Sequence, residues 1–221
     1  MIASRAISLD IETMPNEDMV SKLPEVEASK TLKDPEKIEK DIANKRQEQI
    51  DKMALSPLYG KIACIGLYSQ DYQNVLVGNE EEILKQFFEI TKDKVLITYN
   101  GLNFDIPFIY KRACIYDIFT IKDMKEKVNK YKQDKHIDLM NEFCSYGQYE
   151  KLDTLCSIYL NENKIDFDVK TIKDLIKTSD GVEKLKEYCL RDVELTYKLA
   201  IKFGYIQELF LMKTKEKENV K

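Results

Sequence analysis

The stretch that decides the fold is RAISLDIE, residues 5–12, in which apolar and polar side chains alternate. A period of two predicts a β-strand, because successive side chains of a strand point to opposite faces of the sheet. Asp10 and Glu12 would share one face, so that both carboxylates can converge on one ion. The apolar set on the other face is Ile7, Leu9 and Ile11. Alternating apolar and acidic residues are also common on a half-exposed strand. For this segment taken alone, that simpler interpretation is favoured over an ion-binding site.

The segment that follows the strand is rich in charge and contains no glycine from residue 16 to about 53. Asp34-Pro35-Glu36 has the composition of a helix N-terminus, with proline at the first helical position. Residues 17–53 are therefore predicted to form a helical insertion after the first strand. No aromatic residue occurs in it before Tyr59, so base stacking by the insertion is not expected.

Core patterning resumes at Gly60 and predicts a central sheet. Two neighbouring strands in a hairpin, a helix and a further strand are expected at 61–68, 74–77, 80–91 and 94–99. The order strand, helix, strand indicates a mixed sheet with parallel members. The second half is predicted to be mainly helical, with helices at 105–112, 122–132, 152–159, 171–177 and 182 to about 212.

Length and composition favour a single domain. A chain of 221 residues with 43% hydrophobic content is expected to form one core over residues 1–212, with a charged tail at 213–221. No window approaches 18 consecutive apolar residues, so no membrane association and a cytoplasmic location are expected.

The cysteines and histidine narrow the chemistry. Five cysteines without a CxxC pair argue against a disulfide framework or a zinc knuckle and favour reduced thiols. With His136 as the only histidine, catalysis must depend on carboxylates. The net charge of −4 is unlike that of proteins that coat nucleic acid, but metal ions held by carboxylates would supply positive charge where phosphate binds.

A second segment, TYNGLNFDIP at residues 98–107, has the composition of a strand end, a turn and a helix start. Sites in α/β folds assemble at the carboxyl ends of strands. Asp105 is therefore a candidate site residue. It could equally be the N-cap of the helix, with Pro107 in the first turn, and the two roles can coexist.

A third segment lies in the long predicted helix, where spacings of three and four define one face. Asp192 falls within this otherwise apolar face. Burying a carboxylate costs several kcal/mol, roughly, unless a cation or hydrogen-bond donors compensate it. Tyr188 lies one turn away, so a buried tyrosine–aspartate hydrogen bond is the alternative to a metal site. The face comprises Leu185, Tyr188, Asp192, Leu195 and Leu199.

Together the three segments resemble the motifs of the DEDD (DnaQ-like) 3′-to-5′ exonuclease superfamily. The resemblance is greatest to the proofreading exonuclease domain of family B DNA polymerases and its stand-alone relatives. It extends from residue 5 to about 200, without the insertion. A tyrosine four residues before the last aspartate resembles the tyrosine subgroup, because the other subgroup has histidine where this chain has Glu187. The matching residues are Asp10, Glu12, Asn100, Phe104, Asp105, Tyr188 and Asp192.

The resemblance implies a ribonuclease H-like α/β fold, with a central mixed β-sheet flanked by α-helices. It also implies a metal-dependent 3′-to-5′ exonuclease that hydrolyses phosphodiester bonds with two Mg²⁺ or Mn²⁺ ions, most readily on single-stranded DNA. Nucleic acid would be the binding partner, and the sequence does not identify any replication or repair partner.

Each carboxylate has an implied role. Asp10 would bridge both ions, Glu12 and Asp192 would complete the first site, and Asp105 would hold the second. Tyr188 would orient the attacking water. The residues expected to contact the terminal nucleotide are Thr13, Asn100 and Phe104, for which ordinary turn and core packing is the alternative.

Two other functions stay open. An endonuclease or ribonuclease H-type activity uses similar carboxylates, although the tyrosine spacing argues against it. A non-catalytic nucleic-acid-binding accessory subunit would be expected to lack at least one ligand, and none is missing.

Two further stretches are assigned simpler roles. His136 and Asp138 resemble a segment of the stand-alone relatives and are expected either to be structural or to support the site residues without binding the ions. A lysine-rich stretch could track a phosphate backbone, but a solvated helix face is favoured. Its lysines are Lys122, Lys125, Lys127, Lys130, Lys132 and Lys135.

Overall fold

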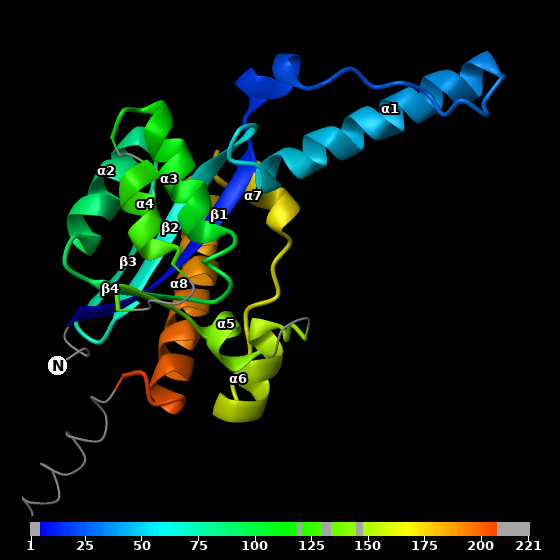
Figure 1. Ribbon diagram of the computed structural model, residues 1–221. Coiled ribbons are helices and arrows are strands. Elements are labelled where there is room, and N and C mark those ends of the chain that lie inside the picture. Colours follow the sequence, from blue (N-terminus) through cyan, green and yellow to red (C-terminus); the bar gives the residue numbers. More distant parts are fainter. Residues whose placement is uncertain (1–4, 119–120, 130–133, 145–147, 207–221) are drawn as a thin grey trace, which may run out of the picture.

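A mixed five-stranded sheet forms the centre of the computed structural model, which describes residues 5–118, 121–129, 134–144 and 148–206 (Figure 1). The strand order is β3-β2-β1-β4-β5. The strands are β1 (Ala6–Pro15), β2 (Gly60–Ser69), β3 (Tyr72–Val77), β4 (Val95–Thr98) and β5 (His136–Asp138). The pairs β1–β2 and β2–β3 are antiparallel, whereas β1–β4 and β4–β5 are parallel. The α/β class and the mixed sheet are therefore confirmed.

Helices cover both faces of the sheet. Side chains of α2 and α3 share one core cluster with β1, β2 and β3, and side chains of α8 pack on the opposite face (Figure 1). The longer helices are α1 (Pro35–Lys52), α2 (Glu80–Thr91), α3 (Asp105–Ile115), α4 (Ile121–Lys127), α6 (Leu152–Leu160) and α8 (Ser179–Lys202). The short ones are η2 (Glu17–Lys22), η3 (Met53–Leu55), α5 (Leu139–Phe143), η4 (Val169–Thr171) and α7 (Ile172–Leu175).

The alternation predicted for the first strand decides which side chains meet which helix. Ile7, Leu9 and Ile11 are buried in the core with α2 and α3. On the other face, the Ser8 hydroxyl donates to the carbonyl of Val193 in α8, at 2.7 Å. The even-numbered residues of β1 therefore face α8.

A glycine lets α8 lie close to the sheet. A Cβ atom at Gly66 of β2 would stand 2.7 Å from the Cys189 Sγ atom, closer than non-bonded atoms tolerate. Only the smallest residue therefore allows this approach between β2 and the helix that carries the third motif.

A β-bulge fixes the end of β1. The β1–β2 register shifts between Glu12 and Thr13, which leaves Ala63 without an opposite residue. The neighbouring Ile62 N–H donates to Glu80 of α2 at 2.7 Å, and Arg112 of α3 binds the same carboxylate at 2.9 and 2.6 Å. Because this ion pair is buried, it holds the bulge, α2 and α3 together.

The helical insertion after the first strand is confirmed. Asp34 caps α1 by accepting the Glu36 N–H at 3.0 Å, and Pro35 begins the helix as predicted. No residue of α1 is buried, and the helix projects away from the sheet (Figure 1). The Thr13 hydroxyl donates to the Ala54 carbonyl at 2.7 Å and so ties the base of the insertion to β1.

The helix predicted to reach residue 212 is shorter, because α8 ends at Lys202. Gly204 has a φ of +86°, a left-handed conformation that stops a helix. The Gly204 and Tyr205 N–H groups donate to the carbonyls of Ile201 and Ala200, which closes the last turn. Residues 207–212 and the predicted tail at 213–221 lie outside the described residues.

The sequence also missed β5 and α5, which have only three and five residues and therefore too little periodicity to detect. The helix predicted at 122–132 ends at Lys127. In the lysine-rich stretch, Lys135 pairs with Glu126 at 2.6 Å. The side chain of Lys122, and Lys130 and Lys132 altogether, lie outside the described residues.

All five cysteines are free thiols, three of them buried, as the spacing predicted. Over the part of the chain that the structure describes, no helix has the length and apolar character needed to cross a membrane.

Candidate active site

Three carboxylates from two elements converge between β1 and α8. One oxygen from each of Asp10, Glu12 and Asp192 lies within 4.8 Å of those of the other two. The alternation of β1 turns Asp10 and Glu12 toward α8, and the helical face of α8 turns Asp192 toward the sheet. Glu12 and Asp192 are buried, while Asp10 keeps part of its surface exposed. The sequence predicts that four carboxylates meet, and the structure groups three of them, without Asp105.

Asp192 is only partly compensated. Its Oδ2 atom pairs with the Lys164 ammonium at 2.6 Å. Its buried Oδ1 atom has no hydrogen-bond partner among the residues that the structure describes. A buried carboxylate oxygen without a donor is rare and points to a group that is still to bind.

Asp105 reaches the same strand from the other side. β4 pairs with β1 only as far as Ser8, so the Ile11 N–H has no strand partner on that side. The Asp105 carboxylate accepts this N–H at 3.0 Å. Asp105 is the first residue of α3 and Phe104 is the N-cap, so the suggestion that Asp105 is the N-cap was wrong. The carboxylate thus stands beside Asp10 but outside the group of three.

Tyr188 lies next to the carboxylates. Its hydroxyl lies near Asp192, and its ring stacks on Phe167 with centroids 4.1 Å apart and planes 9° apart. Lys164 lies 5.6 Å from the centre of the same ring. The phenol ring is therefore held by an aromatic face and a cation.

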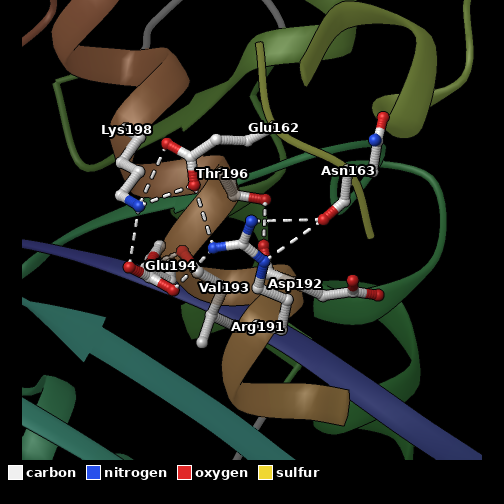
Figure 2. Close-up of polar contacts among 9 residues, drawn as sticks. Glu162, Asn163, Arg191, Asp192, Val193, Glu194, Thr196 and Lys198 are labelled. Carbon is white, nitrogen blue, oxygen red and sulfur yellow. Dashed lines mark hydrogen bonds and ion pairs between the residues drawn. The ribbon is translucent and has the colours of Figure 1, made fainter. Parts of the chain in front are cut away.

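An ion-pair network on the outer side of α8 places the loop that carries Lys164. Arg191 donates to the Asn163 carbonyl from two nitrogens, each at 3.2 Å, and pairs with Glu162 at 3.0 Å. Lys198 joins Glu162 at 2.8 Å. Figure 2 shows this network on one side of the helix, with the Asp192 side chain pointing away from it. The loop is therefore anchored directly before Lys164.

The four carboxylates of the site have raised pKa values. Burial, followed by the charge of Asp192, raises the pKa of Asp10 to about 7, against the opposing effect of Lys164. Burial and the Asp10 charge raise the pKa values of Glu12 and Asp105 well above their usual range. Burial also raises the pKa of Asp192, against Lys164. In each case removal of the carboxylate from water is the largest cause, and neighbouring negative charge adds to it for Asp10, Glu12 and Asp105.

The arrangement fits divalent cations. The donors are carboxylate oxygens, the ligands that Mg²⁺ and Mn²⁺ prefer, and the Oδ1 atom of Asp192 is free to coordinate. Residues that could hold an ion are Asp10, Glu12 and Asp192, with Asp105 beside them.

The side chains expected to contact a nucleotide are placed with different clarity. The Thr13 hydroxyl is engaged by the Ala54 carbonyl. Asn100 lies in a left-handed conformation with a φ of +69° and accepts from the Asn103 amide at 2.9 Å. Phe104 is partly exposed, with its ring 5.6 Å from that of Phe108. Asn100 and Phe104 lie in the turn before Asp105, whereas Thr13 anchors the insertion.

Sequence analysis missed Lys164, Phe167 and Arg191. Lys164 and Phe167 lie in a loop without periodicity, and neither has a neighbour in sequence that marks it as part of a site. Arg191 adjoins Asp192, but the partners through which it acts on the site, Glu162 and Asn163, come from that same loop. Only the folded chain brings these residues together.

The strand order and the carboxylates on β1 and α8 define a ribonuclease H-like α/β protein. The same fold occurs in the family B DNA polymerase of Pyrobaculum calidifontis, to which the structure is similar with a TM-score of 0.59 at 14% identity. That match covers 89% of this chain and 24% of the polymerase.

The family model for predicted 3′-5′ exonucleases related to the exonuclease domain of PolB matches residues 60–221, and the chain belongs to this family. The match begins after the insertion, so Asp10 and Glu12 lie outside it.

Curated relatives are DNA polymerases. The chain is 34% identical to DNA polymerase 1 of Sulfurisphaera ohwakuensis over 55% of this chain and 15% of the polymerase. It is 29% identical to the DNA polymerase of Thermococcus aggregans over 58% of this chain and 8% of that protein. The chain thus matches only a small part of each of these relatives.

The raised pKa values predict how stability depends on pH without metal. A carboxyl group whose pKa is higher in the folded state stabilises the fold when protonated, and that contribution is lost as pH rises through the folded pKa. In EDTA, we expect the melting temperature to fall as the pH rises from about 4, the ordinary pKa of an aspartate in the unfolded chain, to about 7, the folded pKa of Asp10.

Asp10→Asn should reduce this fall, because the amide does not titrate, whereas Asp34→Asn at the exposed start of α1 should leave it unchanged. Thermal unfolding followed by circular dichroism measures both. Equal pH dependence in Asp10→Asn and the unmodified chain would refute the assignment.

Proposed function

We propose that this protein is a metal-dependent 3′-to-5′ exonuclease that removes nucleotides from the 3′ end of single-stranded DNA. The observation that carries the proposal is the meeting of Asp10, Glu12 and Asp192, where the Asp192 Oδ1 atom has no hydrogen-bond partner among the residues that the structure describes. Membership of a family of predicted 3′-5′ exonucleases supports the same reaction. DNA is the substrate proposed because the curated relatives are DNA polymerases.

The carboxylates would hold two Mg²⁺ or Mn²⁺ ions. Asp10 would contribute to both sites, Glu12 and Asp192 to the first, and Asp105 to the second. When bound, such a pair of ions activates a water molecule and neutralises charge on the attacking and leaving oxygens. The raised pKa values support this assignment, because each carboxylate has a deficit of positive charge.

Tyr188 would orient the attacking water. Its hydroxyl lies beside Asp192, and stacking on Phe167 fixes the ring, so the phenol is held before substrate arrives. Burial, followed by the charge of Glu12, raises the pKa of Tyr188, which keeps the phenol protonated and able to donate a hydrogen bond.

Lys164 would supply a positive charge to the reacting phosphate. Burial alone would lower its pKa, but Asp192, Asp10 and Glu12 together raise it, so the side chain is cationic at neutral pH. Water would add to phosphorus, and the bond to the 3′ oxygen would break. The products would be a nucleoside 5′-monophosphate and a strand one residue shorter that ends in a 3′ hydroxyl.

Asn100 and Phe104 would receive the terminal nucleotide. Both are partly exposed at the turn before Asp105, and an aromatic ring beside a site can stack on a base. Thr13 would contribute from the end of β1, through the hydroxyl oxygen that already donates to Ala54.

The direct test uses single-stranded DNA labelled at its 5′ end. With Mg²⁺ or Mn²⁺ we expect a ladder that shortens stepwise from the 3′ end, and no cleavage in EDTA. Asp10→Ala should abolish cleavage with little loss of folding, because it removes one of several repelling carboxylates. The control is Asp71→Ala, an exposed change in the β2–β3 turn, which should cleave normally.

Three outcomes would contradict the proposal. Full activity of Asp10→Ala would remove the central residue. Equal cutting of circular single-stranded DNA would indicate an endonuclease, and binding without cleavage would indicate an accessory subunit.

A second prediction concerns Lys164. Lys164→Met keeps the length of the side chain but removes its charge, and we expect kcat to fall about 10- to 100-fold. Lys170→Met changes an exposed lysine in the same region and should be neutral. Single-turnover cleavage rates measure both, and a normal rate for Lys164→Met would show that Lys164 only neutralises Asp192.

A further inference from the structure

A buried carboxylate outside the site binds four backbone N–H groups. Asp138, at the end of β5, is fully buried. Its Oδ1 atom accepts from Asn100 at 2.9 Å and from Met140 at 3.0 Å, with a longer contact to Asn141 at 3.4 Å. Its Oδ2 atom accepts from Leu102 at 2.8 Å. One side chain therefore caps α5 and holds the turn between β4 and α3.

The backbone N–H of Gly101, between Asn100 and Leu102, is also hydrogen-bonded. Gly101 donates to the Thr98 hydroxyl oxygen at 3.2 Å. The Thr98 oxygen lies 2.8 Å from His136 Nε2, and His136 Nδ1 lies 2.7 Å from the Lys127 carbonyl. A neutral imidazole with its proton on Nδ1 satisfies every contact, and burial lowers the pKa of His136 accordingly. Three successive amides of the turn are thus bound from below.

The turn needs this support because its backbone is unusual. Asn100 has a φ of +69°, a conformation that side chains other than glycine adopt at a cost. Gly101 fits only without a Cβ, which would lie 2.5 Å from Thr98 side-chain atoms. Such a conformation persists where surrounding contacts fix it.

The outer side of the turn carries the residues proposed to bind the terminal nucleotide. Gly101 and Leu102 are buried, whereas Asn100, Asn103 and Phe104 keep exposed surface on the outer side. Asp105, which follows, is held separately by the Ile11 N–H. Loss of the hydrogen bonds from the turn to Asp138 and Thr98 should therefore loosen the turn, while the Asp105 carboxylate keeps its hydrogen bond from Ile11.

We propose that Asp138 is a positioning residue for substrate, which holds the turn from Asn100 to Phe104 in the shape that receives the terminal nucleotide. This inference rests on the proposed function. It assigns His136 and Asp138 a specific task, where the sequence indicated only a structural or supporting role. Asp138 does not touch substrate in this account, and it acts through the backbone of the turn.

The test compares two variants of Asp138 that remove different hydrogen bonds of the same side chain. Asp138→Ser can still cap α5, because serine is a good N-cap, but its short side chain cannot reach the turn. Asp138→Asn keeps the size but places an amide group against an N–H donor. The matched control is Asp34→Ser, which alters an exposed cap of α1 far from the turn.

For both Asp138 variants we expect the KM for single-stranded DNA to rise about tenfold, as loss of hydrogen bonds to a charged group would cause, while kcat changes much less. Mn²⁺ binding, followed by electron paramagnetic resonance of free Mn²⁺, should match that of the unmodified chain. Asp34→Ser should change none of these quantities.

Fluorescence anisotropy with a labelled oligonucleotide, in the Asp10→Ala background, measures binding without cleavage. An unchanged KM and affinity in both Asp138 variants would overturn the inference. So would a loss of kcat and Mn²⁺ binding in proportion to unfolded protein, because that result means a purely structural role. Failure of the unmodified chain to cleave DNA would contradict the proposed function instead, and the anisotropy comparison would still decide the role of Asp138.

Discussion

The repulsion among carboxylates between β1 and α8 is the constraint on which the rest of the molecule depends. Asp10, Glu12 and Asp192 bring their oxygens within 4.8 Å of one another in a largely buried place. Burial, and after it the neighbouring like charges, disfavours ionisation, and the raised pKa values express that cost. Lys164 offsets part of it through one oxygen of Asp192, while the other oxygen has no partner among the described residues. The fold thus keeps several carboxylates close together at a cost in free energy, and cation binding would reduce that cost.

Several parts of the fold exist to maintain this arrangement. Gly66 allows α8 to approach β2 closely enough for Asp192 to face β1. The buried Glu80–Arg112 pair fixes the bulge beside Glu12. Arg191, on the outer side of α8, holds the loop that precedes Lys164 (Figure 2). The same helix therefore carries Asp192 and, through Arg191, positions the Lys164 ammonium that pairs with Asp192. These contacts lie outside the cluster, and each is placed by a different part of the chain.

Much of this was predictable from the sequence, for a physical reason. The period of two in residues 5–12 placed Asp10 and Glu12 on one face, and the helical period around Asp192 placed it on a buried face. Those patterns are local, and the structure bears both out. The end of α8 was predicted wrongly, because the left-handed conformation of Gly204 outweighs the apolar pattern that continues beyond it. Lys164 and Asp138 act through contacts with residues distant in sequence, which no local period encodes.

The number of Mn²⁺ ions that bind tests the central claim most directly, because the cluster is held to be a site for two cations. Electron paramagnetic resonance of free Mn²⁺ during a titration gives this number without reference to any substrate. We expect about two ions per chain, and weaker and incomplete binding by Asp192→Asn, which replaces one ligand oxygen with an amide nitrogen. A chain that binds no Mn²⁺, or an Asp192→Asn variant that binds as the unmodified chain does, would contradict the account.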